Sequence, residues 1–100
     1  MDEYEVIWSL RATDELKSVG EYIARDRPKA AARVVAAILT RVAQLARFPF
    51  SGAKFRRRPE GQYREVSIGK YRIFYRVERA VKRIYIAAIW HGARRELPLP

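Results

Sequence analysis

The stretch that decides the fold is YREVSIGKYRIFYRVERAVKRIYIAAIW, residues 63–90. It holds three runs rich in β-branched and aromatic residues, at 63–68, 71–78 and 82–90, and such runs favour β-strands. The connections between these runs are only a few residues long. Short links predict antiparallel neighbours, because a parallel pair needs a crossover of a dozen or more residues.

The preceding residues supply the other layer. Residues 4–8 predict a further strand of the same sheet, and Ser9 is suited to cap a helix. Apolar residues recur at helical spacing over 10–26 and 28–47, which predicts two amphipathic helices. A basic loop is expected at 53–62. The expected fold class is α+β, in the order β-α-α-β-β-β, with a helical hairpin packed on one face of an antiparallel sheet.

Alternation along 71–77 separates two sets of side chains. One set is apolar and suits the helix-covered face: Tyr71, Ile73, Tyr75 and Val77. The other set is Arg72, Phe74 and Arg76, which we expect on a face open to solvent. We expect Trp8, Phe48, Phe50 and Trp90 in the core, because they end strands or close the helical hairpin.

Charge is the strongest global feature of the sequence. Twenty-one basic and eleven acidic residues give a net charge of +10, and sixteen of the basic residues are arginine. Residues 1–26 carry a balance of −4, from three bases and seven acids, and residues 27–100 carry +14, from eighteen bases and four acids. Such a field attracts nucleic acid or an acidic protein. Arginine suits the forked recognition of phosphate or carboxylate.

Composition also narrows the chemistry. The 100 residues, which we expect to form a single domain, contain no cysteine and one histidine. Disulfides, thiolate metal sites and multi-histidine metal sites are therefore excluded, and we expect no metal or cofactor. No apolar run approaches the roughly 20 residues of a membrane span, and the acidic start does not resemble a signal peptide. We expect a cytoplasmic protein with no membrane contact.

Several segments together resemble the RelE/ParE superfamily of bacterial type II toxin–antitoxin toxins. They are VIWSLRATDEL, RFPFSG, YREVSIGKYRIFYRV and IWHGARRE, and they span essentially the whole chain. The resemblance implies one of two activities. RelE-like members cut messenger RNA in the ribosomal A site without a metal, whereas ParE-like members inhibit DNA gyrase. In both groups, a partly disordered antitoxin segment neutralises the toxin in a hetero-oligomer.

The resemblance also implies a set of site residues. For a RelE-like activity, the matching residues are Arg72, Arg64, Arg94 and His91. Val66 stands where those ribonucleases carry a second basic residue, and no tyrosine follows Tyr85, whereas they have one in the tail. With HGAR, these departures favour a ParE-like inhibitor that binds its target, and a RelE-like mRNA endonuclease is the alternative.

Each candidate residue also has a purely structural interpretation. Arg72 could pair with Glu65 or Glu78 on neighbouring strands, and His91 could simply pack at a strand end. The candidate binding residues are Arg56, Arg57, Arg58, Phe74 and Arg76. They could grip a nucleic-acid backbone or an acidic partner, or the three consecutive arginines could form a solvated loop.

Overall fold

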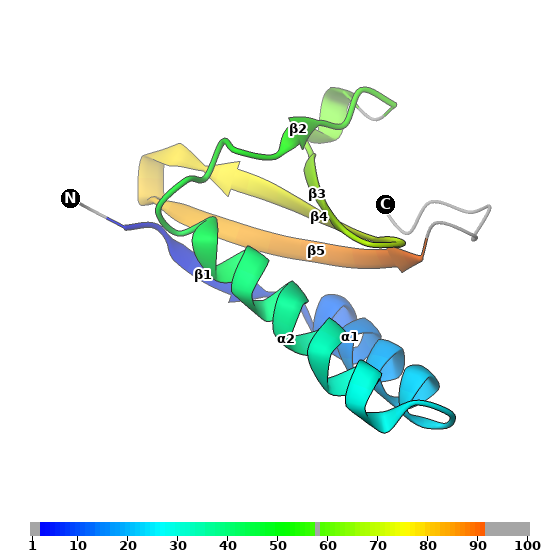
Figure 1. Ribbon diagram of the computed structural model, residues 1–100. Helices are drawn as coiled ribbons and strands as arrows, with labels where there is room; N and C mark the ends of the chain where they lie inside the picture. Colours follow the sequence, from blue (N-terminus) through cyan, green and yellow to red (C-terminus); the bar gives the residue numbers. More distant parts are fainter. Residues whose placement is uncertain (1–2, 58, 92–100) are drawn as a thin grey trace.

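Two helices cover one face of a five-stranded sheet in the computed structural model, which describes residues 3–57 and 59–91 (Figure 1). The helices are α1 (Leu10–Ala24) and α2 (Pro28–Gln44). The strands are β1 (Glu5–Trp8), β2 (Ala53–Lys54), β3 (Arg64–Ile68), β4 (Tyr71–Glu78) and β5 (Arg83–His91). Short 3-10 turns lie at Pro59–Gly61 and Arg79–Val81. The α+β class and the predicted helical hairpin are confirmed.

The sheet is mixed, which corrects the expectation of an antiparallel sheet. Its strand order is β1-β5-β4-β3-β2. The predicted meander of β3, β4 and β5 is antiparallel, but β1 pairs with β5 in parallel, with Glu5 opposite Arg83 and Trp8 opposite Ile86. The two residues of β2 add an edge strand where a loop was expected. The β1–β5 pairing joins distant parts of the chain, so periodicity could not reveal it. The two residues of β2 are too few to show an alternating pattern.

The ends of the elements follow from local chemistry. The Ser9 hydroxyl accepts a hydrogen bond from the Ala12 backbone N–H at 3.0 Å and donates to the Ala87 carbonyl at 3.1 Å. It therefore caps α1 and also ties the start of the helix to β5. Pro28 occupies the first turn of α2, where its missing N–H costs no hydrogen bond. Gly69 turns the chain between β3 and β4 with a φ of 56°, a conformation that glycine adopts readily.

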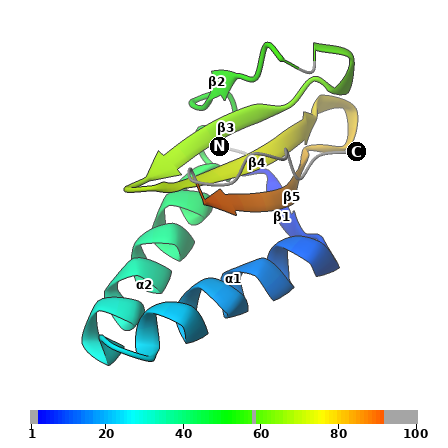
Figure 2. The same cartoon turned by 90° about the vertical axis from the view of Figure 1, so that its right-hand side faces the viewer.

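The main core lies between the helices and the sheet (Figure 2). Its buried members are Ala12, Ile38, Val42, Leu45, Val66, Ile73, Tyr75, Ile84, Ile86 and Ile89. Tyr71 and Val77 pack against it while remaining partly exposed, so the predicted helix-facing set of β4 is confirmed. Among the described residues, neither helix is long and apolar enough to cross a membrane.

The four aromatic residues expected in the core divide into three environments. Trp8 packs at the margin of the main core, and Trp90 is buried on the opposite face of the sheet. The expectation is wrong for Phe48 and Phe50, which are 57% and 40% exposed. α2 ends at Gln44, and the chain then turns through Pro49 so that these two rings face solvent.

Candidate binding surface

The face of the sheet opposite the helices is partly covered by a second, smaller core. Its members are Phe55, Tyr63, Phe74, Ala88 and Trp90. The Phe55 backbone N–H donates to the Tyr63 carbonyl at 2.8 Å, which closes residues 55–63 into a loop, and Figure 2 shows this loop on the side of the sheet away from the helices. Phe74 has 0% exposure. The expectation of an exposed aromatic at Phe74 is therefore wrong, because the loop folds back over that ring.

Arg72 lies on this face, but its guanidinium is already engaged. Its Nη2 contacts the two carboxylate oxygens of Glu65 at 2.6 and 2.8 Å, and its Nε donates to the same carboxylate at 3.0 Å. The guanidinium carbon also lies 5.8, 5.4 and 5.1 Å from the ring centres of Phe55, Phe74 and Trp90. The Arg72 side chain is 31% exposed. The register thus selects Glu65 over Glu78 as the partner, and this ion pair holds the second core together.

The candidate RelE-type residues do not converge on Arg72. Arg64 stands opposite Tyr75 in the β3–β4 register. Since Tyr75 belongs to the main core, the side chain of Arg64 leaves the sheet on the helix side. His91 stands opposite Tyr71, which also faces the helices. Arg94 lies outside the described residues. Of the described candidates, Arg72 is therefore on one face, and Arg64 and His91 are on the other.

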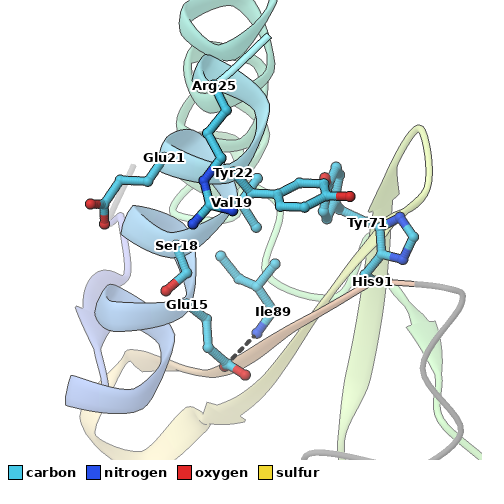
Figure 3. Close-up of a pocket in the computed structure, with 9 residues that line it drawn as sticks. All are labelled: Glu15, Ser18, Val19, Glu21, Tyr22, Arg25, Tyr71, Ile89 and His91. Carbon is cyan, nitrogen blue, oxygen red and sulfur yellow. Dashed lines mark hydrogen bonds between the residues drawn. The ribbon is translucent and has the colours of Figure 1, made fainter.

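His91 borders a pocket of about 660 Å³ between α1 and the ends of β4 and β5 (Figure 3). The His91 ring meets Tyr71 edge-on, with ring centres 5.2 Å apart. Across the pocket, the Glu15 carboxylate accepts a hydrogen bond from the Ile89 backbone N–H at 3.0 Å. The Ile89 N–H lies beyond the end of the β1–β5 pairing and would otherwise lack a backbone acceptor. Glu15 therefore supplies a hydrogen bond that stabilises this edge of the sheet.

A second pocket, of about 550 Å³, has a cationic and aromatic lining. Lys54, Arg56 and Arg64 line it, together with Phe50, Phe55, Pro59, Gln62, Tyr63 and Val77. Arg56 and Arg57 are exposed, as predicted, and Arg58 lies outside the described residues. Arg76 is exposed above the Tyr63 ring, 5.8 Å from its centre. The arrangement is suited to binding an anionic partner.

Sequence reasoning missed the aromatic part of this surface. Phe50 lines the second pocket but had been expected in the core. The available signal was the segment FPFSG at 48–52, because Pro49 and Gly52 mark a turn and connecting segments lie on the surface. Because segment 48–52 lies between a helix and a basic loop, it is better interpreted as exposed.

Several solved structures have the same fold as this chain. The chain resembles the chromosomal ParDE toxin–antitoxin system of P. aeruginosa, with a TM-score of 0.74 and 21% identity over 89% of this chain and 96% of that one. It also resembles the RelBE2 toxin–antitoxin complex of Mycobacterium tuberculosis, with a TM-score of 0.68 and 24% identity over 89% and 98% of the two chains. A mutant of the E. coli toxin RelE in the free state gives a TM-score of 0.67 at 15% identity, over 91% and 85%. At these identities the likeness shows a shared fold, that of RelE and ParE toxins.

Sequence comparison then narrows the class to a family. The family model described as "ParE toxin of type II toxin-antitoxin system, parDE" matches residues 6–96. The protein "Putative toxin Y4kP" of Sinorhizobium fredii is 42% identical over 82 residues, which is 82% of this chain and 84% of that protein. The chain belongs to the ParE toxin family of type II toxin–antitoxin systems.

Proposed function

We propose that this toxin inhibits growth by binding DNA gyrase in the cytoplasm, without cleaving a substrate itself. Membership of the ParE family supports this proposal, because gyrase inhibition is the activity that the resemblance to ParE-like toxins implies. The basic surface around Arg56, Arg57 and Arg76 would favour encounter with an acidic region of the target.

One observation carries the choice of an inhibitor over an endonuclease. A metal-independent ribonuclease needs several basic groups around one phosphate, to position it and to stabilise the charge that develops. Here Arg72 is engaged by Glu65, and Arg64 and His91 lie on the other side of the sheet. Val66, where a further basic residue would be needed, is 6% exposed in the main core. Because these basic residues do not converge on one site, we favour a toxin that inhibits its target by binding it.

We further propose that a cognate antitoxin neutralises the toxin in a hetero-oligomer. Two of the similar solved structures are toxin–antitoxin systems. The balance of +14 over residues 27–100 would attract an acidic segment, and a disordered one could wrap the surface as it folds.

The test compares two activities of one purified preparation. We expect the toxin to block ATP-dependent supercoiling by DNA gyrase and to leave messenger RNA intact on translating ribosomes. The matched control is the same toxin mixed with its antitoxin, which should restore supercoiling. Cleavage of messenger RNA in the A site, with supercoiling unaffected, would reverse the proposal in favour of the endonuclease.

A further inference from the structure

We propose that segment 48–52, hereafter the aromatic loop, uses its exposed phenylalanine rings to dock into the protein target of this toxin. The inference rests on the proposed function, since it assumes that toxicity comes from binding. It goes further by assigning the contact to Phe48 and Phe50, which the sequence had suggested were core residues.

The two rings of the aromatic loop are both exposed and lie close together in the chain. Phe48 is 57% exposed and Phe50 is 40% exposed, and they are two residues apart in a loop that begins a few residues after the end of α2. Leaving large apolar rings in water forgoes the stabilisation that burial would give. A neighbouring pair of such rings marks an interaction site more often than a single exposed ring does.

The aromatic loop is held rigidly although its rings are exposed. The buried Tyr75 hydroxyl donates to the Pro49 carbonyl and accepts from the Gly52 N–H, each at 2.9 Å. From β3, the Arg64 Nη1 donates to the Gly52 and Phe50 carbonyls at 2.8 and 3.3 Å.

The position of Gly52 is part of the same construction. A Cβ at Gly52 would lie 2.5 Å from the Tyr75 hydroxyl oxygen and 2.7 Å from the Glu65 carbonyl oxygen. Only glycine therefore allows this close approach. A surface fixed before binding loses less conformational freedom in the complex, which favours affinity.

Arginines surround the aromatic loop. The guanidinium of Arg47 lies 5.6 Å from the Phe48 ring centre, and those of Arg64 and Arg79 lie 5.1 and 4.7 Å from the Phe50 ring centre. The Arg41 Nη2 donates to the Ser51 hydroxyl at 3.3 Å. Aromatic anchors with arginine neighbours are typical of the high-affinity centre of protein interfaces. The partner that fits is a protein surface with an apolar recess bordered by carboxylates.

Two other occupants fit the aromatic loop less well. A nucleic-acid base that stacked on Phe48 or Phe50 would compete with the guanidinium groups that already lie 5.6 Å and 4.7 Å from their ring centres. A second copy of this chain would bring the same arginines against one another, which is repulsive.

The test replaces both rings and measures toxicity as well as target binding. The variant Phe48→Ser/Phe50→Ser should keep the circular dichroism spectrum and the cooperative unfolding of the wild type, because both rings are exposed. We expect its inhibition of gyrase supercoiling to weaken by about 30-fold or more and its expression to stop arresting growth. The matched control is Leu10→Ser/Leu39→Ser, at two leucines that are 86% and 45% exposed on the helices, and it should inhibit like the wild type.

The outcomes separate this inference from the proposed function. If the wild type inhibits gyrase and the phenylalanine variant inhibits equally well, the aromatic loop is not the docking surface, although the proposed function stands. If the wild type spares gyrase but arrests growth, the proposed target is wrong, and loss of growth arrest in the variant still supports the loop. A variant that stays toxic but escapes its antitoxin would assign the loop to the antitoxin instead. Wild-type binding to a labelled DNA duplex, lost in the variant, would overturn the choice of a protein partner.

Discussion

At the scale of single residues, Arg72 shows how the register decides between a functional and a structural role. Its carboxylate partner Glu65 is only 18% exposed, so removing the arginine leaves a partly buried charge without its cation. We expect Arg72→Ala to lower the free energy of unfolding by about 1–3 kcal/mol, measured by urea denaturation at neutral pH.

A double-mutant cycle with Glu65→Ala distinguishes this pair from an ordinary surface ion pair. We expect a coupling energy above about 1 kcal/mol for Arg72 with Glu65. The control is Arg83 with Glu5, whose side chains are 47% and 65% exposed, and whose coupling should stay below about 0.5 kcal/mol. Equal coupling in the two pairs would mean that the position of Arg72 and Glu65 beside the second core does not strengthen their ion pair.

The sequence allowed both partners of Arg72 to be named, Glu65 and Glu78, but not the choice between them. That choice depends on pairing Ser67 with Arg72 and Glu65 with Phe74, which alternation within one strand does not determine. The same limit applied to Arg64 and His91. Each was correctly placed near a strand, yet the face that each occupies is set by its neighbour across the ladder.

At the scale of elements, Tyr75 joins β4 to the aromatic loop, and its phenol gives this connection a pH dependence. Burial is the largest influence on the pKa of Tyr75 and raises it above the usual 10.0, although the Gly52 N–H, Arg64 and Arg41 act in the opposite direction. A phenol with a raised pKa in the folded state stabilises the fold at pH values below its unfolded pKa. That contribution is lost as the pH rises from about 10 toward the folded pKa.

The variant Tyr75→Phe tests this connection. It removes the hydroxyl that hydrogen-bonds to the Pro49 carbonyl and the Gly52 N–H of the aromatic loop. We therefore expect a loss of about 1–2 kcal/mol in the free energy of unfolding at pH 8. The gap between wild type and variant should narrow above pH 10, because only the wild type must keep this phenol neutral to stay folded. Denaturation curves between pH 8 and pH 10.5 measure the gap, and a gap that stays constant would show that Tyr75 titrates alike in both states.

The helices and the three-strand meander could be predicted because their signals are local. Apolar spacing, Ser9, Pro28 and Gly69 each act within a few residues. The fold-back of residues 55–63 onto Phe74 could not be predicted in the same way. Phe55 and Trp90 are far apart in sequence, and both reach the Phe74 ring only when the sheet has formed.

At the scale of the whole molecule, the uneven charge predicts a strong effect of salt on association. The part of the chain with a balance of +14 should speed encounter with an acidic partner, and dissolved ions should screen that attraction. We expect the association rate constant with the antitoxin to fall at least about tenfold between about 50 and 500 mM salt, as measured by stopped-flow fluorescence.

Matched charge variants locate the source of that steering. Arg56→Gln/Arg57→Gln should flatten the salt dependence, because both side chains are exposed beside the cationic pocket. Lys17→Gln/Arg25→Gln makes the same change in net charge on α1 and at its C-cap, within the acidic part of the chain, and should flatten the salt dependence less. Equal slopes for the two variants would mean that net charge matters and its position does not.

The parallel pairing of β1 with β5 also sets the timing of folding during synthesis. Among the described residues, the first strand to leave the ribosome pairs only with the fifth, and Glu5 lies opposite Arg83, 78 residues later. Until that strand emerges, β1 and β4 each present an unpaired backbone edge. Such distant pairing slows folding. We therefore expect the sheet to be completed only after β5 has left the ribosome, and the unpaired strands to be exposed to proteases until then.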